Sequence, residues 1–261
     1  MLIEPRRNIL IGPLLQIALR RCWAQRDHLL RLGIVPVALI VAIAVPLRRA
    51  LEAMRLSMSP NGIGDPDLAA RCLMLAVAYG FVVAVFAVNW LRQLTLGTRA
   101  APGLGLALNM RHLRFFCAVL AIAMAAMVPV MLVLYPIFVV ALQGEAALVA
   151  VAAMGSMVWA ALLARLSPSW IGIAIDAPMR LSLAWRRTAG QGFKLVVALL
   201  AVEVGALLGQ QVVATVFEIT GLAHVAPMTY LLITAIVDLA AVAVELAVLV
   251  TAFPYFLRET V

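Results

Sequence analysis

Four polar residues with matched spacing interrupt two of the most apolar stretches of the chain. Asp238 and Glu245 are seven residues apart in the last stretch, and Glu203 and Gln210 are seven residues apart in the stretch before it. Seven residues make about two helical turns, so each pair lies on one face of a helix. If the two stretches form an antiparallel hairpin, Glu203 lies near the depth of Glu245, and Gln210 lies near that of Asp238.

These side chains allow more than one kind of chemistry. A carboxylate at the centre of a bilayer costs roughly 2.5–3.5 kcal/mol, so three of them require an explanation. The functional interpretation is a proton or cation path, or a cavity for a polar ligand. The structural interpretation is a hydrogen-bonded clasp between helices, with Asn89 or Gln211 as further partners, worth about 1 kcal/mol per bond. We favour the clasp, because no apolar stretch carries Lys or Arg at its centre. A salt bridge to a second subunit is a third interpretation.

The composition requires a membrane protein. Hydrophobic residues make up 66% of the 261 residues, and the mean hydropathy is +1.09. Soluble globular chains are roughly 45–50% apolar. Apolar stretches long enough to cross a bilayer predict an all-α polytopic fold with six transmembrane helices. These are residues 32–47, 72–91, 115–144, 146–164, 195 to about 217, and about 229 to 257.

The predicted organisation is one integral membrane domain over residues 1–261. Residues 1–31 form an N-terminal basic amphipathic helix, and residues 32–261 form the six-helix bundle. With six spans, all but four of the 20 Lys and Arg residues fall on one side of the membrane, so both termini are expected to be cytoplasmic. The net charge of +8 therefore reflects orientation, and no nucleic-acid partner is expected. The exceptions are Arg48, Arg49, Arg55 and Arg71.

Amphipathic interfacial helices are expected on the cytoplasmic side. Between residues 15 and 30 the apolar positions cluster on one helical face, interrupted by Arg26, so this helix should lie in the interface plane. The alternative is a helix packed on the protein's own domain. Similar segments at 104–112 and 181–189 also precede apolar spans. Anionic lipid headgroups are the expected partners of the basic residues in and near these segments, namely Arg20, Arg21, Arg111, Arg114, Arg186, Arg187 and Lys194.

An elbow is predicted before the fifth span. Residues 180–189 can form a short surface helix on which Leu181, Ala184 and Trp185 face lipid. Gly190 and Gly192 then turn the chain sharply into the membrane, because glycine tolerates left-handed conformations. Phosphate binding by this glycine-rich segment is a less favoured alternative, since no nucleotide-binding pattern surrounds it.

The same segment resembles a group of bacterial six-helix inner-membrane proteins, related to the membrane domain that accompanies some glycerophosphodiester phosphodiesterases. The resemblance implies a membrane module in the bacterial inner membrane. It implies no hydrolysis, because the soluble catalytic barrel is absent from this chain. The matching positions are Ala184, Trp185, Arg186, Thr188 and Gly190, with a second match at Trp90-Leu91-Arg92.

Nucleophilic catalysis and metal binding have no support in the sequence. Ser167, Ser169 and Thr188 lack nearby His and acidic partners, and the three histidines are isolated, so no cofactor and no metal are expected. Small residues repeat every fourth position and could pack helices within the chain, against another membrane protein or in a homo-oligomer. These ridges are Ala152, Ser156, Ala160 and Ala164, and Ala201, Gly205 and Gly209.

The favoured function is a non-catalytic inner-membrane protein, serving as an accessory or scaffold subunit that interacts with lipid and with other membrane proteins. The first alternative is a small-solute or proton-linked transporter that uses Glu203, Asp238 and Glu245. The weaker alternative is a lipid-modifying enzyme at the cytoplasmic interface that uses Asp176 and the neighbouring arginines Arg186 and Arg187.

Overall fold

The computed structural model describes residues 10–57, 65–97, 108–140 and 145–257, and within these ranges all regular structure is helical. Residues 1–9 of the predicted N-terminal helix, and residues 104–107 of the 104–112 segment, lie outside the described residues. The helices follow in the order α1 (Ile11–Ala24), α2 (Arg26–Ser57), α3 (Pro66–Leu96), α4 (Met110–Val140), α5 (Glu145–Ala174), α6 (Leu181–Arg187), α7 (Gly192–Ile219), α8 (Leu222–Val225) and α9 (Pro227–Leu257).

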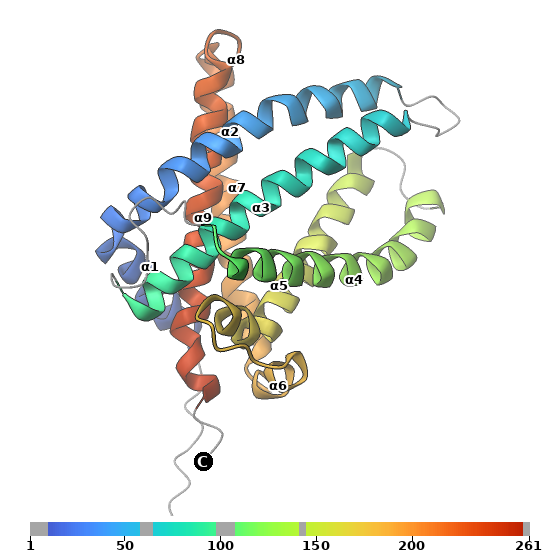
Figure 1. The fold of residues 1–261 in the computed structure, drawn as a ribbon. Helices are drawn as coiled ribbons and strands as arrows, with labels where there is room; N and C mark the ends of the chain where they lie inside the picture. The colour runs from blue at the N-terminus through green and yellow to red at the C-terminus, as the bar shows by residue number, and fades with distance from the viewer. Residues whose placement is uncertain (1–9, 58–64, 98–107, 141–144, 258–261) are drawn as a thin grey trace, which may run out of the picture.

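The long helices pair as three hairpins, α2 with α3, α4 with α5, and α7 with α9. The α7–α9 hairpin stands upright in Figure 1, and the α2–α3 hairpin crosses it obliquely. The short helix α8 lies at one end of the upright hairpin, and α6 and the end of α9 lie at the other (Figure 1). The three hairpins therefore do not form a parallel bundle.

Five helical segments are long and apolar enough to cross a membrane. They agree with the predicted first, second, fifth and sixth spans, and the segment in α5 overlaps the predicted fourth span. The predicted third span, in α4, is not among the five found in the described residues, so the count of six remains a prediction. A helical membrane protein is nevertheless clearly indicated. The five segments are Arg26–Met54, Pro66–Leu96, Met157–Ala174, Gly192–Ile219 and Pro227–Phe256.

The predicted N-terminal helix is divided at Gln25, which corrects its boundary. The backbone N–H of Gln25 bonds to the carbonyl oxygens of Arg21 and Cys22, at 3.1 and 3.2 Å, and closes the end of α1. Residues 26–31 belong instead to the start of α2. The first membrane segment is correspondingly longer than predicted, because α2 continues through Arg48 without interruption.

One face of α1 packs on the protein's own domain. Leu14, Ala18 and Cys22 are buried against α9 and α7, and the Cys22 thiol donates a hydrogen bond to the Ala243 carbonyl at 3.6 Å. Burial raises the pKa of the Cys22 thiol to about 11. The opposite side is exposed and amphipathic, with Gln16 and Arg20 beside Trp23, which is 72% exposed. Packing thus accounts for the buried face, and an interfacial position for the open face remains a prediction.

The core lies where the ends of α3 and α5 meet α9. Its largest fully buried side chains include Trp90, Trp170, Phe86 and Phe256. The Trp90 indole N–H donates to the Ala243 carbonyl oxygen at 2.9 Å, the same oxygen that Cys22 contacts. Helices α1, α3 and α9 are therefore joined at one backbone carbonyl.

Candidate functional site

The α7–α9 hairpin and α3 bring together five polar side chains, which we call the intramembrane polar cluster: Tyr79, Glu203, Gln210, Asp238 and Glu245. The Gln210 amide donates a hydrogen bond to the Asp238 carboxylate. Tyr79 on α3 shares a further side-chain hydrogen bond with Asp238. The juxtaposition of Gln210 and Asp238 is the one expected from an antiparallel hairpin.

The two glutamates of the cluster have different surroundings. Glu203 and Glu245 line a shallow cavity of about 170 Å³ together with Gln210, and the remaining lining is apolar. They lie close enough for their charges to interact. No described Lys or Arg forms an ion pair with either carboxylate. Two like charges repel strongly in a medium of low dielectric constant, so this pair is best placed to hold a proton or a cation.

The partners of the cluster were only partly predictable. The side-chain oxygen of Asn89 lies 3.2 Å from Nε2 of His112, in a different group of polar residues. Gln211 is exposed, and its backbone carbonyl accepts from the Thr215 hydroxyl. Tyr79 takes the place of these residues. The sequence feature that could have indicated Tyr79 is that it is a lone tyrosine within an otherwise apolar span. The hydroxyl of a buried tyrosine must find a hydrogen-bond partner.

A second group of polar residues, here the polar junction, ties α3, α4 and the end of α5 together. It consists of Asn89, Arg92, Arg111, His112 and Asp176. The Asp176 carboxylate lies 3.0 Å from Nη1 of Arg92 and 3.2 Å from Nη2 of Arg111. Nη1 of Arg92 also donates to the Ala174 carbonyl oxygen at 2.9 Å. Asp176 is thus held between two guanidinium groups.

The backbone at Asp176 is shaped for this role. Its φ is +62°, a left-handed conformation that Asp tolerates better than most residues. The Ala177 N–H bonds back to the Gly172 carbonyl at 2.8 Å and closes the turn after α5. Gly172 is required there, because a Cβ would lie 2.5 Å from the Ala177 carbonyl oxygen.

His112 fastens α4 to α3 from within the junction. The side chain is 2% exposed, and its Nδ1 accepts the Asn109 backbone N–H at 3.1 Å. Nε2 therefore carries the proton and donates to Asn89. Burial, together with the charges of Arg111 and Arg92, lowers the pKa of His112. The imidazole is a neutral structural bridge at pH 7.

The elbow before α7 is clamped to α5. The Thr188 hydroxyl lies 3.0 Å from the carbonyl oxygens of both Arg165 and Ala184. In return, Nη1 of Arg165 donates to the Thr188 carbonyl at 3.2 Å, and its guanidinium lies 4.3 Å from the centre of the Trp185 ring. The arginine is thus held by a hydrogen bond and a cation–π contact.

The elbow residues have roles that differ from the prediction in two respects. Gly190 has a φ of +83°, as expected for a sharp turn. Gly192 does not adopt a left-handed conformation; a Cβ there would lie 2.7 Å from Cδ of Arg165, so this glycine permits a close approach instead. Ala184 is fully buried, so it does not face lipid, whereas Trp185 is 46% exposed.

The predicted headgroup residues fall into two groups. Arg111 is engaged by Asp176, with its side chain 26% exposed, and Lys194 is half-buried. Arg187 is half-buried as well. The exposed members, which remain available for lipid, are Arg20, Arg21, Arg114 and Arg186.

Comparison with protein-family models, with curated proteins and with solved structures finds no match. The resemblance of the 184–190 segment to the six-helix inner-membrane proteins thus stays a prediction. Among the described residues, no group of three or more His, Cys, Asp or Glu side chains is placed to hold a metal ion. Any inference about function therefore depends on the geometry of the intramembrane polar cluster and the polar junction.

Proposed function

We propose that this protein is a non-catalytic integral protein of the bacterial inner membrane, an accessory or scaffold subunit that interacts with anionic lipid and with other membrane proteins. Both termini are placed in the cytoplasm under this proposal. The observation that carries it is the polar junction, where Asp176 is shared by Arg92 and Arg111. A carboxylate held in this way joins helices and is poorly suited to act as a base.

Exposed apolar side chains supply surfaces for partners. Residues Leu207, Leu208 and Val212 of α7 are 62–63% exposed, and the described part of α1 adds Trp23 on its open face. In a bilayer such surfaces contact lipid or another helix, and neighbouring small residues allow close approach. This favours association within the membrane over a reaction at the cytoplasmic surface.

The enzyme alternative and the scaffold proposal differ in what Asp176 does. An enzyme should lose turnover on Asp176→Ala and keep its assembly. If the chain is a scaffold, Asp176→Ala should instead disrupt the assembly, because the substitution leaves Arg92 and Arg111 without their shared partner. The test is purification after mild extraction, with the bound proteins and lipids quantified by mass spectrometry. A stoichiometric partner lost on Asp176→Ala supports the proposal, and a stable, fully assembled Asp176→Ala protein that has lost an enzymatic activity contradicts it.

A second candidate is a proton-linked or small-solute transporter, favoured by the shared cavity of Glu203, Gln210 and Glu245. Asp238→Asn in proteoliposomes distinguishes it from the scaffold proposal. A transporter loses flux and keeps its fold. A clasp loses stability instead, because Asp238 accepts from Gln210 and Tyr79. Leu207→Ala, which shortens an apolar side chain lining the same cavity, serves as the matched control.

A further inference from the structure

A hollow between the later part of α2 and the start of α3, here the hairpin hollow, is lined by two arginines among apolar side chains. Its volume is about 490 Å³. Arg49 comes from α2 and Arg71 from α3, and both side chains are exposed. The hollow therefore presents positive charge and hydrocarbon together. The apolar lining residues are Pro46, Ala50, Ala53, Leu68, Met74 and Leu75.

The register of the hairpin places the two arginines opposite each other. On α2 the lining positions 46, 49, 50 and 53 follow the spacing of one helical face, and on α3 the lining positions 68, 71 and 75 do the same. Helices α2 and α3 pair as an antiparallel hairpin, so the two sets run in opposite directions along the hollow (Figure 1). Arg49 and Arg71 are each in the middle of their set, and they therefore lie at about the same level.

In the described part of the chain, no acidic side chain pairs with either arginine. Glu52 and Asp67 are the nearest acidic residues along α2 and α3, but they do not line the hollow and form no ion pair with Arg49 or Arg71. The connecting residues 58–64 contain no Asp or Glu. Two guanidinium groups at one level repel each other, and an anion shared between them removes this repulsion.

The position of these arginines in the sequence also calls for an explanation. They belong to the four basic residues that fall on the predicted outer side, where Lys and Arg are depleted in membrane proteins. A third member, Arg48, lies over the Tyr230 ring at 5.2 Å from its centre. Among the described residues, Arg49 and Arg71 have no such aromatic contact. A ligand that both can reach accounts for their presence.

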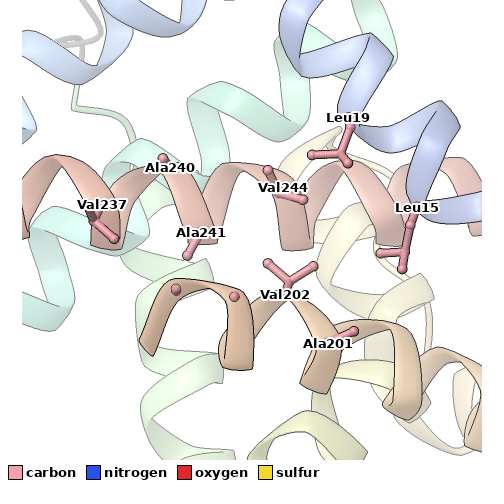
Figure 2. A pocket seen from close by; sticks show the side chains of 10 residues that line it. Leu15, Leu19, Ala201, Val202, Val237, Ala240, Ala241 and Val244 are labelled. Carbon is pink, nitrogen blue, oxygen red and sulfur yellow. The ribbon is translucent and has the colours of Figure 1, made fainter. Parts of the chain in front are cut away.

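Charge distinguishes the hairpin hollow from an apolar groove elsewhere in the molecule. Figure 2 shows that groove, between α1, α7 and α9, with Leu15, Val202 and Val244 around it. All its lining residues are aliphatic or glycine, so an acyl chain and an apolar helix face fit it equally well. The arginines of the hairpin hollow add a requirement for an anion, which an apolar helix face does not meet.

An anionic phospholipid meets both requirements with one molecule. Arg49 and Arg71 belong to the segments Arg26–Met54 and Pro66–Leu96, which are apolar enough to cross a membrane. Arginine in such a position lays its apolar stem along hydrocarbon and extends its guanidinium group to the headgroup layer. There the planar guanidinium matches the geometry of phosphate oxygens. The lining residues further from the connection, Met74 among them, are left to contact an acyl chain.

We propose that the hairpin hollow binds one anionic phospholipid, whose phosphate is shared by Arg49 and Arg71. This inference rests on the proposed lipid-interacting function. It gives that function a site away from the arginines expected at the cytoplasmic surface. The bound phosphate offsets the repulsion between the two guanidinium groups and so strengthens the pairing of α2 with α3 at this end of the hairpin.

The test measures lipid binding to the purified full chain in nanodiscs of phosphatidylglycerol and phosphatidylcholine. A photoreactive form of each lipid is crosslinked in turn, and the labelled peptides are mapped by mass spectrometry. In wild type, phosphatidylglycerol should label residues 46–53 and 68–75 more strongly than phosphatidylcholine does. Replacing Arg49 and Arg71 together by Gln should reduce this labelling about tenfold or more, because each arginine contributes to the attraction of the anionic headgroup. The same replacement of Arg20 and Arg21 removes equal charge elsewhere and should leave it unchanged.

A second variant tests the hollow without altering charge. Ala50→Leu adds bulk to the lining between the two arginines and should also reduce labelling. Ala69→Leu is the matched control, because Ala69 is exposed on α3 and does not line the hollow. Replacing Arg49 and Arg71 by Lys keeps both charges and should retain most of the labelling. The melting temperature of each variant shows that it is folded, and Ala50→Leu serves if the double Gln variant is not.

Labelling that persists at wild-type level in the folded double Gln variant or in folded Ala50→Leu would overturn the proposal. So would equal labelling of wild type by the two lipids, or a second copy of the chain crosslinked at this hollow in place of lipid. All these results concern the purified chain alone. Failure here would therefore leave any stoichiometric protein partner unaffected, whereas failure of the scaffold proposal appears as the absence of such a partner.

Discussion

Replacing Asp176 by Asn tests the structural role of the polar junction. The substitution keeps the shape of the side chain and removes the charge that Arg92 and Arg111 share at 3.0 and 3.2 Å. Removing one partner of a fully buried pair costs about 3–5 kcal/mol, whereas exposed pairs are worth about 0–1 kcal/mol. The Arg92 side chain is 13% exposed but that of Asp176 is 53% exposed, so solvent screens part of the interaction. We expect a loss of about 1–2 kcal/mol in the free energy of unfolding.

Thermal unfolding in detergent measures this loss. At about 2–4 °C per kcal/mol for a chain of this size, the melting temperature should fall by about 2–8 °C. Glu218→Gln is the control, because it removes one exposed carboxylate whose side chain makes no described contact. In a double-mutant cycle, Asp176→Asn and Arg92→Gln should be less than additive, since both remove the same pair. Full additivity, or a melting temperature equal to that of wild type, would refute the structural role of Asp176.

Three further substitutions or modifications examine other contacts. Gly192→Ala should lower the free energy of unfolding by roughly 1–3 kcal/mol, because its Cβ would lie 2.7 Å from Cδ of Arg165. Gly155→Ala is the control and should cause no such loss. Chemical denaturation of the two variants measures the difference, and equal stability would argue against the close approach. Neutral His112 should contribute fully to the free energy of unfolding above its ordinary pKa near 6.5. This contribution should be lost as the pH falls towards the lowered pKa of His112 in the folded protein. His112→Gln should flatten this part of the pH–stability curve, and an unchanged curve would contradict it. Cys22, with a pKa of about 11, should react with a thiol reagent at pH 8 only after unfolding, so rapid labelling of the folded protein at this position would show that α1 is not docked.

Periodicity within the apolar stretches was sufficient for much of the fold. The seven-residue spacing of Glu203 and Gln210, matched by Asp238 and Glu245, predicted which side chains would meet, because hairpin geometry alone sets their relative depth. The break at Gln25 was not predictable in this way. Apolar residues continue on both sides of it, and the helix ends there because α1 docks on α9 while α2 leaves in a new direction.

The polar junction could not be derived from the sequence. His112, Arg92 and Asp176 are far apart along the chain and no single motif contains all three, so only the packing of α3, α4 and α5 brings them together. The elbow illustrates the same limit on a smaller scale. A glycine at 190 could be expected from the need for a turn, but the reason for Gly192 is the side chain of Arg165, which approaches from another helix.

Our central proposal is that the chain acts as a subunit that associates with other molecules in the membrane. The most direct test is the intact mass of the native assembly after mild extraction, measured for the untreated wild-type protein. We expect a mass well above that of the 28.0 kDa chain, made up of a stoichiometric protein partner together with bound anionic phospholipid. A bare 28.0 kDa chain that carries neither, and that drives solute or proton flux in proteoliposomes, would contradict the account.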